Sequence, residues 1–557
     1  MESMRDNSSG ASLPELAGNG ALLRRAALLT AGTGLSRLLG FVRDVLIAHF
    51  LGAGLVADVF LALLRLPTIL RRLLTEGGIA MPFMPAYFAL LLEGGEERAA
   101  GFARAVRAWV LALSTAFCAL GLLFPLPLLL AFAPGLAGHL SALPDGAGFA
   151  AELMQISLPY VPFILLSCVN SALLQSRGNY LAPALAPCIL NICFILPLFL
   201  LLGLGKLEFF AQGPQSARLA ALALVWALPL AGVAQALYLG GAVRQSGFSH
   251  SEKINWRDGA AARFAGVLPS SLCVTAAHQI AVLIAVMAAS FLAEGYITQV
   301  HFADQLIELP LGVFGMALAV AALPDFSALA GGNKREELRG ALKLSLGLVS
   351  FVALPAAAGL FGLARPVVAL LFGHGAFSAA AVDGCAALLS GYALGLPALA
   401  ALRPLIAAIH ALRLTKSAAK AALLSFAATA CAAFSVVALS PILPTPEIIS
   451  LALGLAVSSG ALVFFLLLWR ILGQEKAAPN ARSTLIALRA PLLLSLGIAV
   501  LCKTCAALWP EQHALLPLIL VPLGIFIYGV GALALKCPEA GLLLAFFRAR
   551  RDKGAKG

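Results

Sequence analysis

Fourteen long apolar stretches, separated by short polar or Gly/Pro-containing breaks, dominate this sequence of 557 residues. A helix of about 20 largely apolar residues is long enough to cross the hydrocarbon core of a bilayer. Hydrophobic residues make up 61% of the chain and charged residues 11%, against about 45–50% and about 25% in soluble domains. We therefore expect an all-α integral membrane protein with about 14 transmembrane helices. The predicted spans are 22–49, 56–90, 104–133, 150–175, 181–204, 217–243, 262–293, 297–329, 338–363, 379–410, 415–441, 447–472, 484–507 and 513–536.

Lys and Arg are distributed unequally between the two sides of these predicted spans. The tails and the alternate loops that share their side contain 27 of them, and the other loops contain four. Because short cytoplasmic loops retain Lys and Arg, we predict that both termini are cytoplasmic. The net charge of +12 is then mainly a topology signal, and no nucleic-acid partner is expected.

A faint internal repeat divides the chain. The pattern of residues 122–135 returns at 363–377, and that of 171–191 returns at 403–425. Because transporters are commonly built from such repeats, we predict two pseudo-symmetric six-helix lobes followed by two further helices. The predicted regions are a disordered cytoplasmic tail (1–20), an N-terminal lobe (21–243), a cytoplasmic linker (244–261), a C-terminal lobe (262–473), the last two helices (484–536) and a basic cytoplasmic tail (537–557).

Apart from Arg24 and Arg25, which we count with the N-terminal tail, the first two spans contain five arginines. Arginine is costly inside a bilayer and usually faces a bundle interior or a wet cavity. Helical residues seven apart lie on nearly the same face. Arg37 and Asp44 therefore share a face of the first helix. The second helix has one polar stripe, made of Asp58, Arg65, Arg72 and Glu76.

Two interpretations of these charges remain open. They could be ion pairs that hold the first two helices together, with Arg72–Glu76 as the best candidate. However, five arginines against three acids leave two positive charges in excess. Guanidinium groups bind phosphate oxygens bidentately, so the excess indicates an anionic guest such as a diphosphate.

Four segments carry a resemblance to a known family. The stretches "SRLLGFVRD" (36–44), "FLGAGLVADVFLALLRLPTILRRLLTEGGIAMPFMPAY" (50–87), "ALLQSRGNYLAPALAPCILN" (172–191) and "HFADQLIELPLGVFGMALAVAALPDFS" (301–327) resemble the MurJ (MviN) lipid II flippases. The similarity runs from about residue 22 to 475. It implies the fold of the MOP exporter superfamily, with two lobes around a cationic cavity and a groove for a lipid tail along the last two helices.

The resemblance also implies a set of substrate-binding residues. By position, the first-helix residues of the family cavity match Ser36, Arg37, Arg43 and Asp44, and its second-helix acid matches Asp58. The "RR…EG" element matches Arg71, Arg72 and Glu76. With Arg65 and Gln305, the candidate site is therefore Ser36, Arg37, Arg43, Asp44, Asp58, Arg65, Arg71, Arg72, Glu76 and Gln305.

The sequence departs from the family pattern at two places. Gln305 stands where the family usually has Arg, so the cavity lacks one cation unless Arg403 or His301 replaces it. Ala281 and Ala285 stand where some members have sodium ligands, so we predict no cofactor or metal and leave the coupling ion or use of the membrane potential open. For His278, beside Gln279, we favour packing between helices over a place in the cavity.

We therefore expect a transporter and not an enzyme: a lipid II flippase that moves the undecaprenyl-diphosphate-linked peptidoglycan precursor to the periplasmic leaflet by alternating access. It would act as a monomer in contact with membrane lipids and with the cell-wall synthesis machinery. A MATE-like cation-coupled exporter is one alternative, and it predicts an acidic cavity. A membrane enzyme acting on polyprenyl diphosphates is another, and it predicts an acidic metal cluster or a catalytic His.

Overall fold

The computed structural model describes residues 34–73, 79–203, 214–248, 254–312, 334–509 and 515–541, together with residues 32, 326, 329, 330 and 332. Regular structure within these residues is helical throughout, and its first helix covers residues 34–51. The next helices are α2 (Leu55–Leu73), α3 (Ala80–Leu123), α4 (Pro125–Phe132), α5 (Leu136–His139), η2 (Leu140–Ala142), α6 (Gly146–Ser157), α7 (Tyr160–Ser176), α8 (Leu181–Gly203) and α10 (Pro214–Gln245). The second half contains α11 (Gly259–Thr275), α12 (Ala277–Ala289), α13 (Tyr296–Pro310), α15 (Arg335–Gly362), α16 (Ala364–Phe372), α17 (Ala379–Ala411), α18 (Thr415–Leu439), α19 (Pro446–Gln474), α20 (Ala481–Leu508) and α21 (Leu516–Ala534).

The predicted all-α membrane fold is confirmed. Ten spans among the described residues are long and apolar enough to cross a membrane, and they coincide with ten of the fourteen predicted ones. The other four predicted spans contain the helix 34–51, α2, the broken pair α11–α12 and α13. These helices are short or carry several charged residues, because they supply the polar centre of the molecule.

The structure corrects two predicted boundaries. The second span, predicted as 56–90, divides between α2, which ends at Leu73, and α3, which begins at Ala80. Within α3 the backbone is non-helical at Gly94 and Gly95, and Gly95 has φ +69°, a conformation that glycine adopts at little cost. The third span, predicted to reach 133, ends at Leu123, and the apolar residues beyond it form a helix pair bent by 118°.

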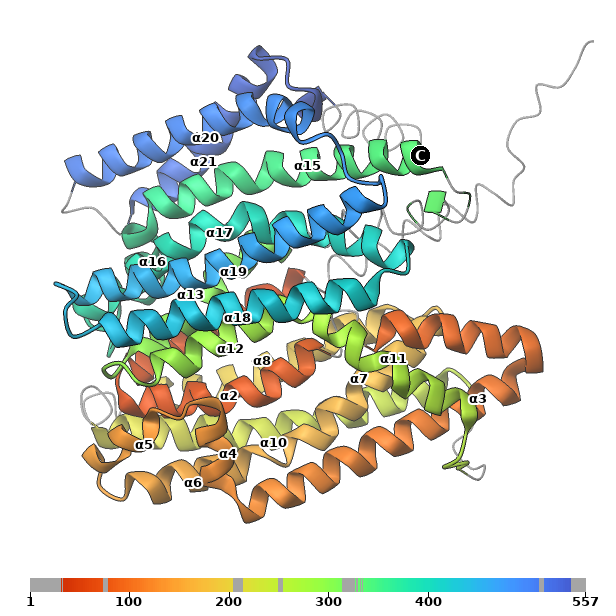
Figure 1. The fold of residues 1–557 in the computed structure, drawn as a ribbon. Helices are drawn as coiled ribbons and strands as arrows, with labels where there is room; N and C mark the ends of the chain where they lie inside the picture. Colours follow the sequence, from red (N-terminus) through yellow and green to blue (C-terminus); the bar gives the residue numbers. More distant parts are fainter. Residues whose placement is uncertain are drawn as a thin grey trace, which may run out of the picture.

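The helices pack mainly within two groups that follow the order of the chain. The helices α3, α6, α7, α8 and α10 contact one another, as do α15, α17, α18 and α19. Figure 1 shows the first group, in orange to yellow, below the second, in green to blue. The helices α2, α12 and α13 lie where the two groups meet. The short helices α4 and α16 each follow a long helix and fall in the two segments of the sequence repeat, 122–135 and 363–377. The limits given above for lobes, linker and tails remain predictions.

The helices α20 and α21 lie beside α15 at one edge of the molecule (Figure 1). The hydroxyl of Tyr528 in α21 donates a hydrogen bond of 2.7 Å to the carbonyl of Phe351 in α15. The two rings also contact each other, with centroids 5.0 Å apart. The outward side of α21 exposes large apolar side chains such as Ile525 and Phe526, as expected for a helix that faces lipid.

Replacing Tyr528 with Phe should loosen this edge slightly. The change removes one hydrogen bond and keeps the ring, so we expect a loss of about 0.6–1 kcal/mol of stability. The measurement is thermal unfolding in detergent micelles, combined with amide exchange in α21. Tyr238→Phe, at a side chain that is 38% exposed, is the matched control and should change neither. An equal shift in both variants would show that the contact with α15 is not the cause.

Candidate functional site

The charged residues of α2 meet a polar face of α13 near the middle of the molecule. Arg65 and Arg72 are seven residues apart on α2 and therefore lie on nearly the same face of the helix. Asp304 and Glu308 are four residues apart on α13, which likewise places them on one face. Because α2 packs against both α12 and α13, these faces are brought together over a sequence separation of more than 200 residues.

Arg72 has the most contacts in this cluster. Its Nη1 atom donates to Gln279 Oε1 at 3.1 Å and forms an ion pair with Glu308. The same atom lies 3.8 Å from Asp304 Oδ2. Its Nη2 atom donates to Gln305 Oε1 at 3.0 Å. One guanidinium group therefore joins α2 to both α12 and α13.

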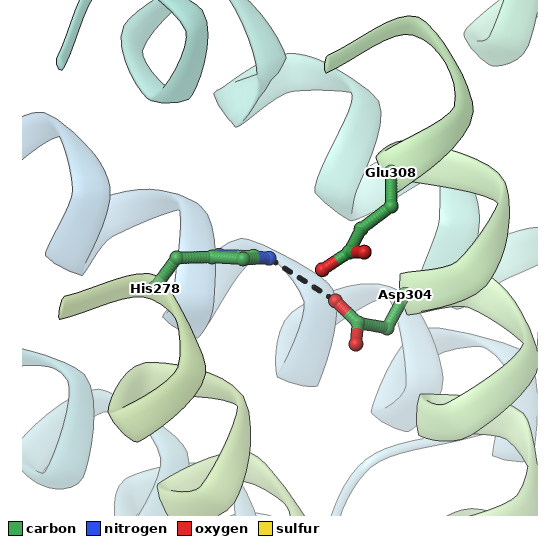
Figure 2. A group of neighbouring side chains, drawn as sticks. All are labelled: His278, Asp304 and Glu308. Atoms are coloured by element: carbon green, nitrogen blue, oxygen red, sulfur yellow. Dashed lines mark hydrogen bonds and ion pairs between the residues drawn. The ribbon is translucent and has the colours of Figure 1, made fainter. Parts of the chain in front are cut away.

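Asp304 is the buried acid of the cluster, with only 1% of its side chain exposed. Its Oδ2 atom pairs with Arg65 Nη1 at 3.3 Å, and its Oδ1 atom lies 3.1 Å from His278 Nε2. Figure 2 shows the imidazole of His278 pointing from its own helix toward the two carboxylates of α13. Glu308 is the most exposed member, at 25% of its side chain.

Arg43 and Asp44 form a second ion pair, in which the Nε and Nη2 atoms of Arg43 donate to Asp44 Oδ1 at 2.9 and 2.7 Å. Arg43 also donates to Asn191 Oδ1 at 3.1 Å. Gln305 Nε2 donates to Asp44 Oδ2 at 2.5 Å. Since Gln305 accepts from Arg72 as well, its uncharged amide links the two ion-pair groups through charge-assisted hydrogen bonds.

Arg37 lies at the C-terminal end of α13. Its Nη1 atom is 3.4 Å from the carbonyl oxygen of Glu308, and a side-chain carbon added at Gly312 would overlap the guanidinium group. The carbonyl end of a helix carries a partial negative charge, which favours an arginine there. A side chain at position 312 would therefore require the guanidinium group of Arg37 to move away from the backbone.

Asp58 has a different role from the one predicted by the stripe on α2. Its Oδ1 atom accepts hydrogen bonds from the backbone N–H and the hydroxyl of Thr298, at 2.8 and 2.7 Å. Its Oδ2 atom accepts from the N–H of Gly295 at 2.6 Å. The carboxylate therefore caps the N-terminus of α13, a common place for an acid, and it lies outside the arginine cluster.

The remaining candidates are placed less specifically. Asn191 Nδ2 donates to the backbone carbonyl of Ser36 at 2.8 Å. Ser36 therefore contacts the site through a main-chain oxygen, by way of the asparagine that also binds Arg43. Arg71 is half-buried. Glu76 lies outside the described residues, so the Arg72–Glu76 pair stays a prediction; the described acidic partners of Arg72 are Asp304 and Glu308. Gln305 leaves the cavity one cation short of the family pattern. The two residues proposed to replace that cation, Arg403 and His301, are both half-buried.

Asp304, Glu308, His278 and Gln279 are the site residues that the sequence analysis missed. For His278 the sequence favoured packing between helices, and its contact in the structure is with a neighbouring helix, at Asp304 of α13. Gln279 donates to Glu308 of the same helix. The signal available in the sequence was the spacing of Asp304 and Glu308, four residues apart on an otherwise apolar segment. The described cluster has four guanidinium groups, of Arg37, Arg43, Arg65 and Arg72, and three carboxylates, of Asp44, Asp304 and Glu308.

Comparisons with known proteins identify the family of the chain. A family model described as "Lipid II flippase MurJ" matches residues 47–522, which is most of the chain. The chain belongs to this family. A "Probable lipid II flippase MurJ" of Rhizobium meliloti is 32% identical over 402 residues, covering 69% of this chain and 70% of the relative. Another, of Buchnera aphidicola subsp. Acyrthosiphon pisum, is 28% identical over 486 residues, covering 86% and 89%.

Solved structures of the family and of more distant transporters share the fold. The structure titled "Lipid II flippase MurJ, inward closed conformation" has a TM-score of 0.70 and 22% identity, covering 91% of this chain and 98% of that chain. An inward-facing multidrug resistance MATE family transporter of the MOP superfamily has a TM-score of 0.56 and 16% identity, covering 79% and 95%. At these identities the likeness establishes the fold, and the family assignment rests on the sequence comparisons.

Proposed function

We propose that this protein is a lipid II flippase of the bacterial inner membrane, a transporter and not an enzyme. It moves the lipid-linked peptidoglycan precursor from the cytoplasmic to the periplasmic leaflet by alternating access. Membership of the MurJ family supports this proposal directly. The observation that carries it is the cluster of four arginines between the two groups of helices, because the lipid diphosphate needs such a cationic partner at membrane depth.

The contacts of the arginines define how the substrate would compete for them. Arg72 and Arg43 are held by carboxylates, so a diphosphate must replace those acids as the acceptor for the guanidinium N–H groups. Phosphate offers the same bidentate geometry as a carboxylate and a higher charge. The excess of one guanidinium over the carboxylates in the described cluster favours this exchange.

Contacts at the other end of α2 close the site on the side that we assign to the periplasm. Asp58 caps α13 there. The N–H of Ala376 donates to the carbonyl of His49 at 2.9 Å, and the N–H of Gly135 donates to Ser290 Oγ at 2.9 Å. Each of these contacts joins the first half of the chain to the second. Opening toward the periplasm would require all three to break.

The orientation in the membrane and the site for the lipid tail are supported by the loop charges and by the last two helices. The excess of Lys and Arg on one set of loops supports cytoplasmic termini. The exposed apolar face of α21 beside α20 and α15 supports a groove for the undecaprenyl chain. The same proposal includes the substrate-site assignments, a monomeric state, contacts with cell-wall synthesis enzymes and use of the membrane potential. A cation exporter would need a net acidic site, which disagrees with four guanidinium groups facing three carboxylates.

Lipid II accessibility at the periplasmic face tests the proposal. The host is a Gram-negative strain depleted of its own flippase and expressing this protein, Arg72→Gln or Arg365→Gln. We expect the parent and Arg365→Gln to restore periplasmic lipid II, since Arg365 forms an exposed ion pair with Asp383. Arg72→Gln should reduce it at least tenfold at equal expression. The proposal would be refuted if the expressed protein failed to restore periplasmic lipid II and the purified protein also failed to bind lipid II.

A further inference from the structure

The Nη1 atom of Arg72 occupies the centre of a ring of oxygen atoms. Gln279 Oε1 lies 3.1 Å away, Asp304 Oδ2 lies 3.8 Å away, and a Glu308 carboxylate oxygen is in direct contact. His278 Nε2, from α12, contacts the other oxygen of the same carboxylate, Asp304 Oδ1, at 3.1 Å. A positively charged atom that lies among two carboxylates and an amide oxygen, beside a carboxylate that also contacts an imidazole, lies close to where a bound cation would be held.

His278, Asp304 and Glu308 provide the donors of a metal site as well as the partners of an arginine. One nitrogen of His278 and one oxygen of each carboxylate all lie within 4.8 Å of one another. Figure 2 shows the three side chains pointing toward one another. The 3.1 Å between His278 Nε2 and Asp304 Oδ1 is close to the separation of about 3.3 Å between two ligands of a tetrahedral zinc ion with bonds of about 2.0–2.1 Å. Imidazole with carboxylates is a donor set typical of zinc and related divalent ions.

Removing Arg72 from this ring would leave the carboxylates short of positive charge. Arg65 would still pair with Asp304 Oδ2, whereas the partner that Glu308 would keep among the described residues is the amide of Gln279, at 3.0 Å. Asp304 is almost fully buried, and unbalanced charge at a buried site is costly. A cation that enters when Arg72 leaves would therefore be held strongly, and the partly exposed Glu308 gives it a way in.

We propose that His278, Asp304 and Glu308 form a divalent-cation site of the zinc class, which Arg72 occupies in the present conformation. The metal would bridge His278 Nε2, Asp304 Oδ1 and Glu308 after the guanidinium group moves away. The fourth ligand would be a water molecule or an oxygen of the anionic guest. Metal and anion then bind cooperatively, because the anion removes the side chain that competes with the metal.

Zinc binding without any lipid tests the site itself. The purified full-length protein in detergent is titrated calorimetrically with Zn²⁺, alongside Arg72→Gln and the double variant Arg72→Gln/His278→Gln. We expect Arg72→Gln to bind one Zn²⁺ at least tenfold more tightly than the parent. The double variant should lose that gain. Arg72→Gln/His410→Gln is the matched control, since His410 lies at the end of α17, and it should keep the gain.

Two results would overturn the site. The first is an Arg72→Gln protein that folds, judged by its helical circular dichroism, and binds Zn²⁺ no more tightly than the parent. The second is a gain that survives in Arg72→Gln/His278→Gln, because the metal would then lie at one of the other seven His or the ten Cys of the chain. Neither result depends on transport, so either one would leave the flippase proposal standing.

The coupling to the guest rests on the proposed function and has its own measurement. Lipid II affinity of the parent is measured at two free Zn²⁺ concentrations, which a chelator buffer holds fixed because diphosphates bind zinc in solution. We expect at least a fivefold tighter affinity at the higher concentration, and no change in His278→Gln. By linkage, lipid II must tighten zinc binding by the same factor. Lipid II binding that is independent of zinc in the parent would overturn the coupling while supporting the flippase assignment.

Discussion

Replacing Asp304 with Asn is expected to destabilise the protein and to abolish lipid II transport. The buried carboxylate pairs with Arg65, approaches Arg72 and contacts His278. The amide that replaces it is similar in shape but carries no charge. Arg65, whose side chain is only 4% exposed, therefore loses its described ion pair. Breaking one partner of a buried ion pair typically costs about 3–5 kcal/mol. Urea unfolding in micelles and periplasmic lipid II accessibility are the two measurements.

Asp383→Asn is the matched control for this variant. Asp383 pairs with Arg365 at 2.6 Å, but both side chains are about one-third to one-half exposed, and exposed ion pairs contribute about 0–1 kcal/mol. Asp383→Asn should therefore unfold at nearly the parent urea concentration and transport normally. If Asp304→Asn behaved in the same way, the charge of Asp304 would be needed neither to position the arginines for transport nor to stabilise the fold.

Hydropathy was sufficient to predict the long apolar helices. The spans that became α15, α17, α18 and α19 are long apolar runs between polar breaks, and their ends lie within a few residues of the prediction. An error occurs where the chain changes direction inside an apolar run. The bend after α4 is such a place, because an apolar run does not record a change of direction.

The arginines could be predicted as a site because charges are rare in membrane segments, but their partners could not be identified from spacing. Helical periodicity relates residues on one helix, and it placed Arg65 and Arg72 together correctly. It gives no information on which other helix faces them. Asp304 and Glu308 follow α2 by more than 200 residues, and His278 comes from a third helix. As a result the acids that balance the cluster were counted wrongly.

Asp58 shows a second limit of the same argument. Its spacing from Arg65 and Arg72 suits an acid that neutralises arginines on one stripe. Its actual partners are backbone N–H groups at the start of α13. Every helix has such unpaired donors at its first turn, so composition cannot indicate which of them an acid will reach. The consequence is functional, because this contact joins the two halves of the chain at one face of the membrane.

Replacing Asp58 with Asn is expected to weaken that closure and to favour the conformation open on the proposed periplasmic side. The carboxylate accepts three hydrogen bonds. The amide has one oxygen to offer and turns its NH₂ group toward a backbone N–H. The loss is about 1–3 kcal/mol, which corresponds to about a 5–150-fold change in the ratio of closed to open conformations. Hydrogen exchange of the amides of residues 295–298, followed by mass spectrometry, should accelerate by a similar factor.

Ser378→Ala provides the control for Asp58→Asn, since Ser378 Oγ also caps a helix, accepting from the N–H of Ala381 at 3.3 Å. That cap lies within one half of the chain, so its loss should speed exchange only in the first turn of α17. Asp58→Asn should speed exchange at Ala376 as well, because the bond from Ala376 to His49 opens with the same movement. Faster exchange confined to residues 295–298 would mean that Asp58 only caps a helix. Faster exchange at both places would identify it as part of the closure between the two halves.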